Sequence, residues 1–147
     1  MNQNQNNQFS SIPEDLLTPQ AMWDYVYAMK KPYPPGEAIL AQSARTAYWY
    51  AKYILGPGKR FTQGEAAIMT DMAYAPLYAI HQMKSRWEEI EHKIILMPSI
   101  SRTYASAFSL SLDLANRRFM PIFSAVSSSP TVTDAKITKR PETKRRK

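Results

Sequence analysis

The sequence predicts an all-α fold in which about four short helix-pair repeats stack as a small solenoid. A sparse motif, Glu-x-x-Leu/Ile followed by Tyr-Ala, occurs four times, always with 13 residues from Glu to Tyr. The spacing between copies varies, through 23, 28 and 26 residues. A constant interior with variable joints is typical of repeated supersecondary units joined by loops. The copies are Glu14/Leu17/Tyr27-Ala28, Glu37/Leu40/Tyr50-Ala51, Glu65/Ile68/Tyr78-Ala79 and Glu91/Ile94/Tyr104-Ala105.

The glutamate of each copy is expected in the first turn of a short helix, where its charge suits the helix dipole. Two copies have a hydroxyl residue three positions before the glutamate, Ser11 before Glu14 and Thr62 before Glu65. That spacing predicts a capping box, in which the hydroxyl and the carboxylate each accept a backbone N–H.

A second, longer helix is expected to carry each Tyr-Ala pair, because apolar residues recur around the pair at helical spacing. Pro76 is tolerated in the first turn of such a helix if the helix begins near Ala73. The breaks between the short and the long helices are expected near Thr18-Pro19, Ser43, Asp71 and Pro98-Ser99.

The chain divides into three predicted parts. Residues 1–10 are rich in Asn and Gln and form a predicted disordered leader, and residues 11–126 form the helical repeat domain. Phe108 to Leu112 alternates like a strand, but its context favours continuation of the last helix, and residues 112–126 then form a capping helix over the last repeat. Residues 127–147 form a predicted disordered basic tail.

The bulk composition indicates an intracellular protein. The 147 residues fit one domain, and the absence of cysteine excludes disulfides, thiolate zinc sites and cysteine nucleophiles. No apolar run approaches the length of a membrane span, and the N-terminus lacks the pattern of a secretory signal. We therefore expect no membrane partner.

The positive charge is concentrated at one end of the chain. Of 19 basic and 12 acidic residues, seven basic residues and one acid lie in residues 135–147, which leaves 12 and 11 in the rest and a charge of +1 there. The tail is therefore the segment suited to RNA, DNA or another polyanion. Its basic residues are Lys136, Lys139, Arg140, Lys144, Arg145, Arg146 and Lys147.

Two segments of the sequence, at the start of the third and fourth copies, resemble a known viral repeat. Arg60-Phe61-x-x-x-Glu65-x-x-Ile68 and Arg86-Trp87-Glu88-Glu89-Ile90-Glu91-x-x-Ile94, each followed by Tyr-Ala, are similar to the Arg-Trp-x-Glu-Ala-Glu-x-x-Ile…Tyr-Ala repeat of tailed bacteriophages and large DNA viruses. The chain departs from that pattern at Ile90, and at Pro32-Tyr33 where no Arg precedes the aromatic residue. The resemblance implies a viral, phage-type origin, an all-helical repeat fold and the cytoplasm of a host cell.

The motifs of catalysis and cofactor binding are missing or incomplete. Glu89 and His92 have the spacing of one half of a di-iron site, but a second such pair is lacking. The glycines form no phosphate-binding loop, and no nucleophile elbow occurs. Arg60 and Arg86 could bind phosphate, but stacking on the adjacent aromatic residue and pairing with a neighbouring Glu is the favoured interpretation. We expect no enzyme activity, no metal and no cofactor.

The aromatic residues indicate a binding surface. Tyr48, Trp49 and Tyr50 cannot all point inward, because successive helical residues lie about 100° apart. We expect Tyr48, Trp49 and Tyr53 to form a protein interface; packing alone and stacking of single-stranded bases are the alternatives. Taken with the resemblance to the viral repeat, which implies a viral origin, the chain is predicted to bind a host or viral protein, as a regulator or inhibitor. Nucleic-acid binding through the tail and a structural role in a virion are the alternatives.

Overall fold

The computed structural model describes residues 12–122, and this part of the chain is mostly helical, as predicted. Its α-helices are α1 (Pro19–Met29), α2 (Glu37–Leu40), α3 (Ala44–Trp49), α4 (Glu65–Ile68), α5 (Ala75–Tyr78), α6 (Glu88–Ile94) and α7 (Pro98–Ala107). The prediction of an all-α fold was wrong, because β1 (Leu110–Asp113) and β2 (Arg118–Pro121) form a two-stranded antiparallel sheet.

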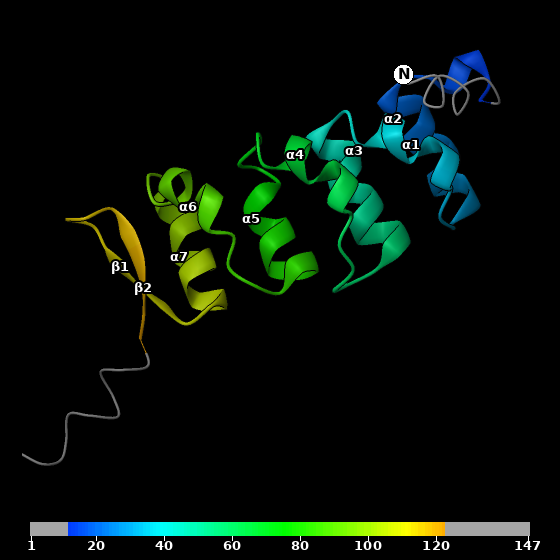
Figure 1. Ribbon diagram of the computed structural model, residues 1–147. Helices are drawn as coiled ribbons and strands as arrows, with labels where there is room; N and C mark the ends of the chain where they lie inside the picture. The colour runs from blue at the N-terminus through cyan, green and yellow to red at the C-terminus, as the bar shows by residue number, and fades with distance from the viewer. Residues whose placement is uncertain (1–11, 123–147) are drawn as a thin grey trace, which may run out of the picture.

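The helices follow one another across the molecule in sequence order, from α1 and α2 at one end to the β1–β2 hairpin at the other (Figure 1). A short helix precedes a longer one in the pairs α2–α3, α4–α5 and α6–α7, where wide π-helical turns extend α3 through Tyr50–Leu55 and α5 through Ala79–Met83. The main contacts join sequence neighbours: α1 packs on α2, α3 on α4 and α5 on α6.

Three of the four long helices begin at the predicted breaks, whereas α5 begins at Ala75, four residues after the break predicted near Asp71. Thr18 caps α1, because its hydroxyl oxygen accepts the backbone N–H of Ala21 at 3.2 Å, and proline follows as the first helical residue. Ser43 is the N-cap residue of α3, and α7 begins at Pro98. Pro76 lies in the first turn of α5, where its missing N–H costs no helical hydrogen bond.

The predicted capping box at Thr62 does not form. Residues Thr62–Gly64 make a 3₁₀ turn, and the N-cap residue of α4 is Gly64, without a side-chain cap. The Glu65 carboxylate instead accepts hydrogen bonds from Arg60 and Tyr78, so it is not available to cap the backbone. The second predicted box begins at Ser11, which lies outside the described residues.

The core runs through the last three copies of the sequence motif. Tyr50, Tyr78 and Tyr104 are each completely buried, and the alanine that follows each of them is buried too. The leucine or isoleucine of the same copies, Leu40, Ile68 and Ile94, is also completely buried. The motif therefore marks residues that pack against one another.

The first copy was assigned in the wrong register. Glu14, Leu17 and Tyr27 are exposed, and Tyr27 is 44% accessible. The glycine that directly precedes the motif glutamate in the second and third copies shows the correct register, because it packs on the preceding long helix. A Cβ on Gly64 would collide with Ala47 of α3, and a Cβ on Gly36 would collide with Met22 of α1.

Met22 therefore holds the position in α1 that Ala47 holds in α3. The buried residue that corresponds to Ala51 is then Val26, and the position of Tyr50 is taken by Tyr25. The match of Glu14 with Tyr27-Ala28 in the sequence is a coincidence of spacing.

The segment after α7 forms a β-hairpin where a helix was predicted. Leu112 pairs with Phe119 and Asp113 with Arg118 across the sheet. The side chain of Phe119 is buried, with its ring 5.3 Å from the ring of Tyr104. The hairpin thus covers the last helix pair, which is the role predicted for a capping helix; the alternation from Phe108 to Leu112 was the correct signal.

Several predictions concern parts of the chain outside residues 12–122. These are the leader at residues 1–10 and the tail at residues 127–147. Both remain predictions.

We expect Phe119→Ala to lower the free energy of unfolding by about 3–5 kcal/mol, because it empties a buried ring site against Tyr104. Urea unfolding followed by circular dichroism measures this. Met120→Ala is the control: Met120 is 38% accessible and its loss is expected to change stability by less than about 1 kcal/mol. Equal effects of the two variants would contradict the capping role of the hairpin.

Candidate functional site

The third copy of the motif forms a hydrogen-bonded clamp at the start of α4. The Tyr78 hydroxyl donates to Glu65 Oε1 at 2.9 Å and accepts the backbone N–H of Phe61 at 2.6 Å. Arg60 donates to both oxygens of Glu65, at 2.7 and 2.6 Å. One carboxylate therefore joins the loop before α4 to the tyrosine of α5.

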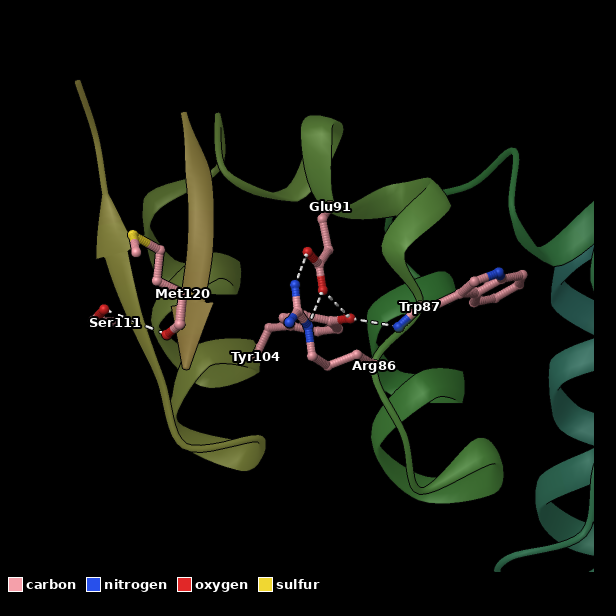
Figure 2. Close-up of polar contacts among 6 residues, drawn as sticks. All are labelled: Arg86, Trp87, Glu91, Tyr104, Ser111 and Met120. Carbon is pink, nitrogen blue, oxygen red and sulfur yellow. Dashed lines mark hydrogen bonds and ion pairs between the residues drawn. The ribbon is translucent and has the colours of Figure 1, made fainter. Parts of the chain in front are cut away.

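The fourth copy repeats this clamp, as Figure 2 shows. Tyr104 donates to Glu91 Oε1 at 3.0 Å and accepts the N–H of Trp87 at 2.6 Å, and Arg86 donates to both oxygens of Glu91 at 2.8 and 2.7 Å. The ring of Trp87 points away from this network (Figure 2). It lies 5.8 Å from the ring of Tyr78. Trp87 therefore links the two clamps, since its backbone binds one tyrosine and its ring packs on the other.

The second copy keeps the tyrosine bond without the arginine. Tyr50 donates to Glu37 Oε1 at 2.6 Å, and Pro32 stands five residues before Glu37, where the third and fourth copies have arginine. The ring of Phe61 lies 4.9 Å from that of Tyr50. A ring contact of the same kind joins Tyr33 to Tyr25 of α1 at 5.5 Å, so the linkage from one unit to the next begins at Tyr25.

The electrostatics of the third clamp follow from these bonds. The hydrogen bonds from Arg60 hold the pKa of the Glu65 carboxyl below its ordinary value. Burial raises the pKa of the Tyr78 hydroxyl, and its hydrogen bond to Glu65 raises that pKa further. Because the pKa of Glu65 is lowered in the folded state, its carboxylate stabilises the fold at neutral pH, and this contribution is lost as the pH falls. Because the pKa of Tyr78 is raised, the contribution of its hydroxyl is present below pH 10.0 and is lost as the pH rises above that value.

The charged groups of the clamps bind one another, so they are not available to bind a ligand. The predicted pairing of Arg60 and Arg86 with a neighbouring glutamate is confirmed. The predicted stacking of the arginine on the adjacent aromatic residue is wrong for Arg86, because the ring of Trp87 points away from it (Figure 2). Both guanidinium groups hold a carboxylate with two hydrogen bonds, the arrangement that would otherwise bind phosphate. The candidate site therefore lies elsewhere.

The candidate site is a cluster of four aromatic rings on α1 and on α3 with its extension, which we call the aromatic face: Trp23, Tyr27, Trp49 and Tyr53. The ring of Trp23 lies 5.0 Å from Tyr27 and 5.5 Å from Trp49, and the ring of Tyr53 lies 6.4 Å from Tyr27. The rings line a hollow of about 260 Å³. Tyr53 is 54% accessible and Tyr27 is 44% accessible, whereas Trp23 forms the buried floor.

Three cations lie over these rings. The ammonium nitrogen of Lys30 is 3.0 Å from the centroid of Tyr27, the Arg45 guanidinium carbon is 5.1 Å from that of Trp49, and the Lys52 ammonium nitrogen is 5.1 Å from that of Tyr53. Such contacts stabilise a cation by the negative face of the ring. The aromatic face is therefore bordered by positive charge.

The predicted interface residues are only partly in this place. Trp49 and Tyr53 belong to the aromatic face, but Tyr48 is 3% accessible and packs 5.5 Å from Tyr74. The prediction that Tyr48 is available to a partner was wrong, because this side of α3 faces the next unit of the chain. Helical spacing alone could not decide which of three adjacent aromatic residues turns outward.

Trp23 and Tyr27 were missed as site residues. They are four positions apart on α1, as Trp49 and Tyr53 are on the following long helix. Residues four apart on a helix share one face. Two such aromatic pairs on consecutive long helices are a signal that could have located the face from the sequence.

Other parts of the molecule are weaker candidates for a functional site. An apolar hollow of about 220 Å³ between α5 and α7 is lined by residues such as Leu77, Ile80 and Ile100, and none of its lining residues is ionisable. Within residues 12–122, no group of three or more His, Cys, Asp or Glu is placed to hold a metal ion. Glu89 and His92 therefore do not belong to such a group. The seven basic tail residues predicted to bind polyanions, Lys136 to Lys147, lie outside the described part of the chain.

Among the helices of residues 12–122, none has both the length and the apolar character to cross a membrane.

Comparison of the chain with protein-family models, with curated proteins and with solved structures gives no match in any of the three.

We expect Tyr78→Phe to lower the free energy of unfolding by about 1–3 kcal/mol, because it leaves the buried N–H of Phe61 without an acceptor. The matched control is Tyr25→Phe, at an exposed tyrosine, which is expected to change stability by less than about 0.5 kcal/mol. Chemical denaturation of both variants measures the difference. A Tyr78→Phe protein as stable as the control would show that the clamp contributes nothing.

Proposed function

We propose that this chain is a non-enzymatic helical-repeat protein that binds a macromolecular partner through its aromatic face. Its helix pairs act as the units of a small solenoid, closed at one end by the β-hairpin. The binding surface lies on the first two long helices.

The recurring clamps support the repeat arrangement. The tyrosine of each of the last three copies donates to a glutamate 13 residues earlier, and the main contacts between elements join sequence neighbours. Arrays in which each unit contacts its neighbours present extended surfaces and commonly serve as binding scaffolds.

The single observation that carries the binding proposal is the accessible aromatic cluster. Tyr27 and Tyr53 remain largely exposed although they belong to a four-ring group. Tyr and Trp are enriched at the energetic centres of interfaces, where they lose water on binding. Packing inside the molecule does not require these two rings to stay accessible.

The proposal assigns no catalytic residue. The carboxylates Glu65 and Glu91, whose side chains are largely buried, are held by arginine and tyrosine in the clamps. The viral, phage-type origin and a role as a regulator or inhibitor of a host system are part of the same proposal. They rest on the resemblance of the Arg-aromatic joints at Arg60 and Arg86 to the repeat of bacteriophages and large DNA viruses.

A pull-down from host cells with the tagged full chain tests the proposal. Wild type is compared with Tyr53→Ala, which removes the most exposed ring of the face, and with Leu96→Ala, which removes a 63% accessible side chain between α6 and α7. We expect the recovered partner to be lost with Tyr53→Ala and kept with Leu96→Ala, while urea unfolding reports both variants as folded.

Parallel samples treated with nuclease report whether recovery depends on nucleic acid. Equal recovery with Tyr53→Ala and wild type would contradict binding through the aromatic face.

A further inference from the structure

The aromatic face offers planar surfaces to a ligand. Its hollow of about 260 Å³ is smaller than the usual pocket for a drug-sized molecule, and it is lined by rings alone. Tyr27 and Tyr53 stand at its open side, above the buried ring of Trp23. This shape suits flat groups that stack one at a time on exposed rings.

The charge around the face is one-sided. Lys30, Arg45 and Lys52 lie over its rings, and none of the three takes part in an ion pair among the described residues. Arg45 donates to the side-chain oxygen of Gln20 at 2.7 Å, which leaves its charge unbalanced.

On the helices that carry the face, acidic residues do not cancel these cations. In α1, α3 and the extension of α3, the one acidic residue is Asp24, which accepts a hydrogen bond from Gln20. The face is therefore complementary to a ligand with negative charges.

We propose that the aromatic face binds single-stranded nucleic acid, with bases displacing the cations that lie over Tyr27, Trp49 and Tyr53, and with Lys30, Arg45 and Lys52 then pairing with the phosphates. Aromatic platforms combined with a cationic border are the general means by which proteins hold unpaired strands without sequence preference. A duplex does not fit, because its paired bases hide their ring faces inside the stack. The inference rests on the proposed function and names the partner of the same surface.

The lysines beside the aromatic face also favour nucleic acid over a protein as its ligand. Lysine is depleted in the cores of protein interfaces, whereas two of the three cations over these rings are lysines. The inference therefore favours the alternative of base stacking over the protein partner that the sequence analysis expected for these aromatic residues. It adds the helical body to the basic tail as a predicted nucleic-acid-binding segment.

The experiment measures binding of the full chain to a fluorescent 12-nucleotide single strand by anisotropy over a series of salt concentrations. The variants are Tyr53→Ala, Lys52→Glu and the control Lys93→Glu, which makes the same charge change at an exposed position on α6. The basic tail is identical in every protein, so it cannot produce a difference between them. Unfolding midpoints confirm that each variant is folded.

We expect Tyr53→Ala to weaken binding about tenfold or more, as the loss of one stacked base does. Lys52→Glu is expected to weaken binding and to reduce the slope of log K against log salt by about one or more, because a phosphate contact is lost. Lys93→Glu should stay within about threefold of wild type. A 12-base-pair duplex should be insensitive to Tyr53→Ala.

Equal affinities of all four proteins for the single strand would overturn the inference and assign binding to the tail. An absence of binding by wild type would also overturn the inference. If Tyr53→Ala still loses its partner in the pull-down, in nuclease-treated and untreated samples alike, the face binds a protein and the proposed function stands. If the pull-down is also unchanged, both proposals fail.

Discussion

The hydrogen bond from each motif tyrosine to the glutamate 13 residues before it is the constraint on which the rest of the fold depends. Tyr50, Tyr78 and Tyr104 are completely buried, and a buried hydroxyl without a partner costs about 1–3 kcal/mol. The carboxylate at the start of the short helix supplies that partner. The interval is constant because the bond crosses from the short helix to the long one, whereas the loops between units are free to vary.

The same tyrosines connect one unit to the next. Phe61 packs on Tyr50 and Trp87 packs on Tyr78, while the backbone N–H of each aromatic residue binds the tyrosine of its own unit. Phe119 on β2 lies against Tyr104 in the same manner and ends the series. This chain of contacts fixes the orientation of successive long helices. The aromatic face then lies where α1 meets the extended α3.

The sequence predicted the helices well where one residue determines the local structure, as at Thr18 and Pro98. It failed where two alternatives share a pattern. The first copy matched Glu14 to Tyr27 by spacing, although the buried positions follow from Met22, and only the close approach of Gly36 to Met22 reveals that register. The hairpin was missed because four-residue strands give too short an alternation to outweigh a helical context. At the site, Trp49 and Tyr53 were identified and Tyr48 was wrong, since the direction of a side chain on a helix depends on which neighbour covers it.

The most direct test of the clamp is native-state hydrogen exchange at the backbone amides of Phe61 and Trp87. Both precede a short helix and donate to a tyrosine hydroxyl at 2.6 Å, in place of a helical carbonyl. We expect both amides to be protected as strongly as those within α7, and Tyr104→Phe to remove the protection of Trp87 while that of Phe61 remains. Exchange of the two wild-type amides at the rate of an unstructured peptide would contradict the account, because the tyrosines would then not hold the units together.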